Sequence, residues 1–96
     1  MLLTLHIIKI ESGDYRAQLM EGAQHLGDYE TTSIAEAIRL AAENPLPDLA
    51  GFHIWYEHVS IGSVPAGDMR RDPEALARRL VELHALFSNS HSKGFP

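Results

Sequence analysis

One apolar segment near the start constrains the fold more than any other part of the chain: residues 3–11, which are rich in Leu and Ile. If this segment is a strand, Leu3, Leu5 and Ile7 point to one face, and Ile8 and Ile10 point to the other. Both faces of the strand therefore need cover from water. We expect helices of the same chain to cover one face and a second copy of the protein to cover the other, which predicts a homodimer.

The next residues predict that the first strand opens an antiparallel meander. Ser12-Gly13-Asp14 is a turn cluster of the kind that joins hairpin strands. Apolar and polar residues then alternate over 15–19, as in a half-buried strand. After Gly22, residues 24–31 are more polar, which favours a strand at the edge of the sheet.

Two helices and one more strand complete the predicted order. Ser33 and Glu36 form a Ser-x-x-Glu capping signature ahead of a helix over about 34–43, and Asn44-Pro45 supplies its stop. After the loop at 45–48, residues 52–59 alternate aromatic and branched side chains, which predicts a strand. Asp72-Pro73 then caps a second helix to about residue 87. Its apolar stripe is Leu76, Leu80, Leu83 and Phe87.

This β-β-β-α-β-α order predicts an α+β fold, a two-layer sandwich. We expect a mainly antiparallel four-stranded sheet with both helices on one face. Residues 1–89 form a single domain in this interpretation, and residues 90–96 form a mobile tail.

The residues around the third strand also suggest a family. The hairpin at Gly13-Asp14-Tyr15 and the stretch from Gly27 to Ile38 resemble the HicB-like antitoxin domain. In that domain three strands lead through a Gly-Asp-Thr-like turn into a Glu-Ala-containing helix and a further strand. The resemblance covers about the first 60 residues. It implies a small sheet-and-helix domain that binds a partner protein and commonly self-associates. The chain departs from the family's pattern in having Glu21-Gly22-Ala23-Gln24 where a Pro-Gly loop is usual, and in lacking a separate DNA-binding segment.

Composition excludes several functional classes. The 96 residues contain no Cys, which removes disulfides, thiol nucleophiles and cysteine-ligated metals. The net charge of −5 argues against general nucleic-acid binding. No apolar stretch reaches the roughly 20 residues of a membrane span, and no signal peptide is recognisable, so we expect a cytoplasmic protein without membrane contact.

The histidines and the single Trp provide the main candidate site. In the strand over 52–59, His53, Trp55 and Glu57 share one face, while Phe52, Ile54, Tyr56 and His58 share the other, more apolar face. We therefore expect His53, Trp55 and Glu57 on the open face of the sheet, near His6 of the first strand. This group predicts a surface for a partner or ligand. An alternative is a metal site in which His53 and Glu57, with His6, are ligands. A second alternative places Trp55 in the core.

Arginines gather ahead of and within the last helix. Residues 1–57 contain 3 basic and 9 acidic residues, whereas residues 58–96 contain 5 and 4. Arg70 and Arg71 are candidates for contact with an anion, and RNA binding through residues 70–79 is a third functional hypothesis. The sequence contains no Gly-x-Ser-x-Gly nucleophile motif and no P-loop. We therefore predict no catalytic residues and no cofactor, and favour a non-enzymatic interaction module, with a protein partner as a further option.

Overall fold

The computed structural model describes residues 2–43 and 48–93, and the side chains of residues 2–43 and 48–87. These residues form five strands and three helices, which confirms the prediction of an α+β fold. In chain order the elements are β1 (Leu2–Glu11), β2 (Asp14–Glu21), β3 (Gln24–Thr31), α1 (Ile34–Ala42), β4 (Gly51–Tyr56), β5 (Val59–Pro65), α2 (Ala66–Arg71) and α3 (Pro73–Lys93).

The strands form one mixed sheet in the order β3-β2-β1-β4-β5. The pairs β1–β2, β2–β3 and β4–β5 are antiparallel, whereas β1 and β4 are parallel. A parallel pair needs a crossover connection, and α1 lies within the segment that links β3 to β4. The predicted four-stranded sheet was therefore wrong in its strand count, and it missed the parallel pair at the centre.

The extra strand arises from a turn inside the segment that we predicted as one strand over 52–59. The strand β4 ends at Tyr56, and Tyr56 pairs with Val59 across a turn made by Glu57 and His58. Glu57 has a φ of 54°, a left-handed conformation that lets the chain reverse. His58 is therefore exposed in the turn, and its predicted place on the core face was wrong.

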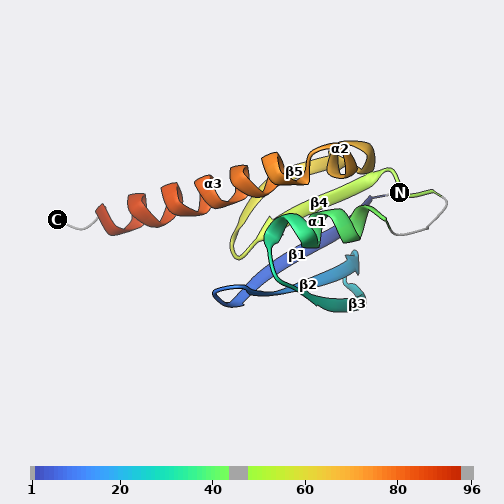
Figure 1. The fold of residues 1–96 in the computed structure, drawn as a ribbon, viewed down its shortest axis with the longest axis horizontal. Coiled ribbons are helices and arrows are strands. Elements are labelled where there is room, and N and C mark those ends of the chain that lie inside the picture. The colour runs from blue at the N-terminus through green and yellow to red at the C-terminus, as the bar shows by residue number, and fades with distance from the viewer. Residues whose placement is uncertain (1, 44–47, 94–96) are drawn as a thin grey trace.

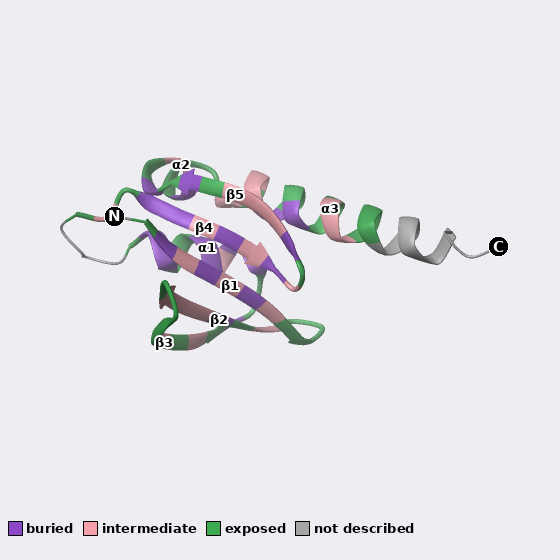
Figure 2. Cartoon of the chain, turned by 180° about the vertical axis from the view of Figure 1, so that it is seen from behind, coloured by how far each residue is buried: buried purple, intermediate pink, exposed green. Residues whose placement is uncertain are grey.

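Helices α1 and α3 lie on the same face of the sheet, as predicted, and the other face is left open (Figures 1 and 2). The short helix α2 was not predicted, because Pro65 and Gly67 indicate a loop. It buries Ala66 and Met69 beside the other two helices and β5. The distal part of α3 extends past the sheet (Figure 1).

The core lies between the sheet and the helices (Figure 2). Alternate residues of the central strands point into it, and the interior faces of α1 and α3 close it from the other side. Its largest fully buried side chains are Phe52, Leu3, Leu5, Ile7, Ile38, Ile54, Met69 and Leu80.

The predicted helix starts are confirmed by their caps. The Ser33 Oγ accepts a hydrogen bond from the Glu36 N–H at 3.1 Å, and the Glu36 carboxylate accepts one from the Thr32 N–H at 2.9 Å. The Asp72 carboxylate accepts the Ala75 N–H at 3.1 Å, as expected of an N-cap.

The ends of the two predicted helices differ from the observed ends. Helix α1 ends at Ala42, and its predicted stop at Asn44-Pro45 lies outside the described residues, as does most of the predicted loop over 45–48. Helix α3 continues to Lys93, so it is longer than predicted and includes part of the predicted tail over 90–96. Residues 94–96 of that tail lie outside the described residues.

Gly51 marks a close approach between β4 and β5. A Cβ atom at this position would collide with the carbonyl oxygen of Val64 and lie 2.9 Å from the Cα of Pro65. The Ala66 N–H also donates a hydrogen bond to the Ala50 carbonyl at 3.0 Å beside it. Glycine at this position therefore sets how closely β5 pairs with β4.

Within the described ranges, none of the helices combines the length and the hydropathy needed to cross a membrane.

Candidate interaction surface

The sheet face that the helices leave uncovered carries a group of half-buried side chains, which we call the open face. It is formed by the central strands and their neighbours. Its members are Thr4, His6 and Ile8 of β1, Gln18 and Met20 of β2, His53 and Trp55 of β4, and Ser60 of β5. Their neighbours along each strand point to the buried side. The open face is thus a continuous surface across four strands.

The register places the candidate residues next to one another. His6 lies opposite Trp55 in the parallel β1–β4 pair, and Thr4 lies opposite His53. Trp55 in turn lies opposite Ser60 of β5. The structure therefore brings His6, His53 and Trp55 together on the open face, as the sequence predicted. Phe52, Ile54 and Tyr56 are buried and Trp55 is half-buried, so the alternative with Trp55 in the core was wrong.

Hydrogen bonds hold both imidazoles of the open face. The Nε2 atom of His6 lies 2.8 Å from the carbonyl oxygen of Glu57. The Nε2 atom of His53 lies 3.1 Å from the Oγ of Ser60, and its ring lies 5.6 Å from the Trp55 ring, centroid to centroid. These contacts fix the positions of two rings next to Trp55, that of His6 on β1 and that of His53 on β4.

Glu57 lies in the turn after β4, so the prediction that it shares the strand face with His53 and Trp55 was wrong. Its carboxylate accepts a hydrogen bond from the Lys9 N–H at 2.9 Å, while His6 contacts its carbonyl oxygen. In the described part of the chain, no three His, Asp or Glu side chains lie together as metal ligands do. The three residues of the metal hypothesis thus lie near one another without forming a ligand set.

A hollow of about 300 Å³ adjoins the open face beside Trp55. It lies where the β4–β5 hairpin meets α3, and its walls include His58, Val59, Leu83 and Phe87. The His58 ring is 5.3 Å from the Phe87 ring in an edge-on arrangement. Beyond this point α3 is poorly covered, since Leu86 and Phe87 are 63% and 59% exposed. This hollow was not predicted from the sequence, because the turn at Glu57 and His58 creates it.

Arg70 and Arg71, the candidate anion contacts, already have partners in the chain. The Arg70 guanidinium donates to the Ala42 carbonyl at the end of α1 at 2.8 Å. The Arg71 guanidinium forms an ion pair with Asp68 at 2.8 Å. Arg78 and Arg79 are exposed on α3. Arg70 therefore links α2 to the end of α1, and Arg71 forms an ion pair within α2.

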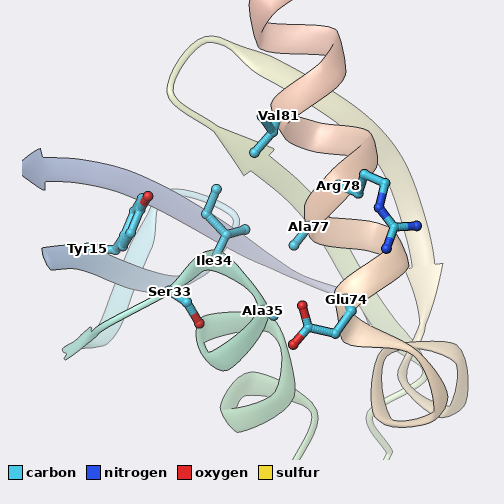
Figure 3. Close-up of a pocket in the computed structure, with 8 residues that line it drawn as sticks. All are labelled: Tyr15, Ser33, Ile34, Ala35, Glu74, Ala77, Arg78 and Val81. Carbon is cyan, nitrogen blue, oxygen red and sulfur yellow. The ribbon is translucent and has the colours of Figure 1, made fainter. Parts of the chain in front are cut away.

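A second hollow, of about 240 Å³, lies between the start of α1 and α3 (Figure 3). Tyr15 and Ser33 line one side, and Glu74 and Arg78 project from α3 on the other. The two α3 charges are of opposite sign, so the hollow offers no uniform field for an ion. Residues of β2, the start of α1 and α3 form this hollow together, and it was not predicted from the sequence.

Two tyrosines have shifted pKa values on the helix-covered side. Burial raises the pKa of Tyr29 well above its ordinary value, and its hydroxyl donates to the Ala37 carbonyl at 2.7 Å. Burial, followed by the proximity of Tyr15 and Glu57, raises the pKa of Tyr56. Both groups therefore stay neutral at physiological pH, and neither lies on the open face.

Comparison of the chain with protein-family models, with curated proteins and with solved structures found no match.

Proposed function

We propose that this chain is a small, non-enzymatic protein-interaction domain that forms a homodimer through the open face. One observation carries the proposal: the half-buried Trp55 and its neighbours form a continuous surface across β2, β1, β4 and β5. A Trp on a flat sheet offers a large contact area together with an N–H donor, and such residues commonly anchor interfaces.

The chemistry of the open face favours a second copy as its occupant. Its half-buried members are apolar, aromatic, hydroxyl or amide side chains and two histidines, and the formal charges on the same side of the sheet, the Arg16–Glu30 ion pair and Asp28, lie beside them toward β3. Two such faces can meet without burying an unpaired charge, which would be costly. A nucleic acid or other polyanion would instead need a basic surface.

The size of the open face also suits a dimer. Four strands spaced about 4.8 Å apart, each contributing about seven residues at about 3.3 Å per residue, give a face on the order of 450 Å². Two copies would together bury about 900 Å², the size of a weak interface that dissociates on dilution. The HicB-like resemblance also implies self-association. It is equally compatible with a partner protein that binds the open face in place of the second copy.

Sedimentation velocity over a dilution series, at neutral pH and constant salt, tests the proposal. We expect a dimer at micromolar concentration that dissociates on dilution, with a shift in the emission of Trp55, the single Trp of the chain. Trp55→Ala should weaken the dimer by about 30-fold or more, as expected when an interface anchor is removed at a cost of about 2 kcal/mol.

Leu86→Ala is the matched control, because Leu86 is an exposed apolar residue that lies on α3 and outside the open face. Its dissociation constant should equal that of the unmodified protein. A monomer at every concentration would rule out the homodimer. A dimer that responds to Leu86→Ala and not to Trp55→Ala would place the interface on α3 and contradict the proposal.

A further inference from the structure

The hydrogen bonds of the open face determine which ring nitrogen of each histidine carries the proton. The Glu57 carbonyl can only accept, so the His6 Nε2 that lies 2.8 Å from it must be the N–H donor. The Ser60 hydroxyl donates to the Ile54 carbonyl at 2.8 Å and accepts the Gly62 N–H at 2.9 Å. Its remaining lone pair must therefore accept from the Nε2 of His53.

Both imidazoles consequently keep Nδ1 as the atom that takes up a proton when the pH falls. Protonation at Nδ1 leaves the Nε2 hydrogen bonds intact, because a charged imidazole still donates from Nε2. Acidification can thus add positive charge to the open face without breaking the contacts that hold His6 and His53. The fold of the free protein need not change.

We infer that acidification dissociates the dimer by charging His6 and His53, so that the open face works as a pH-dependent interface. The inference rests on the proposed homodimer. With neutral imidazoles the two faces meet without added charge, whereas protonation brings up to two cations per copy next to Trp55. Burying these cations against their counterparts in the second copy opposes association.

Within one copy, the side chains around the two rings provide little negative charge to balance a protonated imidazole. Gln18 and Trp55 flank His6 on the two neighbouring strands, and Thr4 and Ser63 flank His53. The carboxylate of Glu57, the residue whose carbonyl contacts His6, accepts the Lys9 N–H. Other titratable or charged side chains on this side of the sheet are Asp14 and Arg16 of β2, with Arg16 opposite Ile8, and His25, Asp28 and Glu30 of β3. Of these, Arg16 and Glu30 form an ion pair at 3.4 Å.

The size of the effect follows from proton linkage. In general, an imidazole that must be neutral in a dimer and becomes charged in the free protein weakens association by about tenfold for each pH unit over which it is charged. The sign is that association is strongest while the imidazoles are neutral and is lost as acidification protonates them. One such histidine per copy raises the dissociation constant about 100-fold, and two per copy raise it up to about 10,000-fold.

Sedimentation velocity at pH 7.5 and pH 5.5, at equal ionic strength, tests the inference. The unmodified protein should show at least a 100-fold rise in dissociation constant at pH 5.5, with an unchanged far-UV circular dichroism spectrum. The variant His6→Gln/His53→Gln keeps a side-chain N–H donor and cannot become charged, so its dissociation constant should change less than about threefold. His58→Gln is the matched control, since His58 lies in the β4–β5 turn, and it should retain the full pH dependence.

The outcomes separate this inference from the proposed function. A dimer with the same dissociation constant at both pH values overturns the inference and leaves the homodimer intact. A tighter dimer at pH 5.5 also overturns it, because the imidazoles would then meet carboxylates of the second copy. A monomer at both pH values rules out the proposed function itself. Retention of the pH dependence by the double Gln variant would assign the effect to other groups and refute the roles of His6 and His53.

Discussion

Replacing Gly51 by Ala should separate β4 from β5, because backbone atoms occupy the space that the new Cβ needs. The Cβ would collide with the Val64 carbonyl oxygen and lie 2.9 Å from the Pro65 Cα, whereas ordinary contacts begin at about 3.4 Å. No side-chain rotation can relieve this contact. We expect about 1–3 kcal/mol of overpacking strain. Loss of the adjacent Ala66 N–H to Ala50 hydrogen bond adds about 1 kcal/mol.

Urea denaturation followed by circular dichroism measures this effect. Gly51→Ala should lower the free energy of unfolding by about 2–4 kcal/mol and the melting temperature by roughly 10 °C or more. Gly67→Ala is the matched control: Gly67 lies in α2 with nothing within 4 Å of a new Cβ, so alanine should leave stability unchanged or raise it by up to about 1 kcal/mol. Equal unfolding midpoints for Gly51→Ala and the unmodified protein would refute the close approach of the two strands.

Two further changes test the helix-covered side of the sheet. Tyr29→Phe removes the hydrogen bond to the Ala37 carbonyl and should cost about 1 kcal/mol at pH 8. Because burial raises the pKa of Tyr29, its contribution is complete below the unfolded-state pKa of about 10 and is lost as the pH rises. The Phe variant should therefore lose less stability than the unmodified protein between pH 9.5 and 11.5, and parallel stability curves would contradict this. Ser33→Ala removes the N-cap of α1 and should cost about 1 kcal/mol in urea titrations. Ser33→Gly should restore most of that loss, so equal values for all three proteins would argue against the cap.

The sequence predicted those features that depend on local patterns. Ser33, Glu36 and Asp72 indicated the helix starts, because capping needs particular side chains at fixed spacing. The alternation over residues 52–56 correctly placed His53 and Trp55 on the face opposite the core. The apolar residues on both faces of β1 predicted a covered second face, which stays a prediction, and the central position of β1 in the sheet was not predicted.

The features that the sequence did not predict depend on backbone conformation or on contacts between distant segments. The predicted single strand over 52–59 is in fact β4 and the start of β5, because the chain turns at Glu57 and His58. A Glu-His pair does not indicate a left-handed turn, so the sequence did not predict this break. The parallel pairing of β1 with β4 depends on how α1 crosses the sheet, which periodicity does not reveal. The predicted position of Glu57 on the strand face was wrong for the same reason, since Glu57 belongs to this turn.

The central position of β1 also sets an order for folding. Leu5 pairs with Leu19, 14 positions later, and with Ile54, 49 positions later. During synthesis the β1–β2–β3 meander can form from local contacts, while the other edge of β1 stays unpaired until β4 emerges. An apolar strand with a free edge can pair with another chain. We therefore expect chains truncated before Gly51 to aggregate, and we expect β4 formation to be the step that ends this exposure.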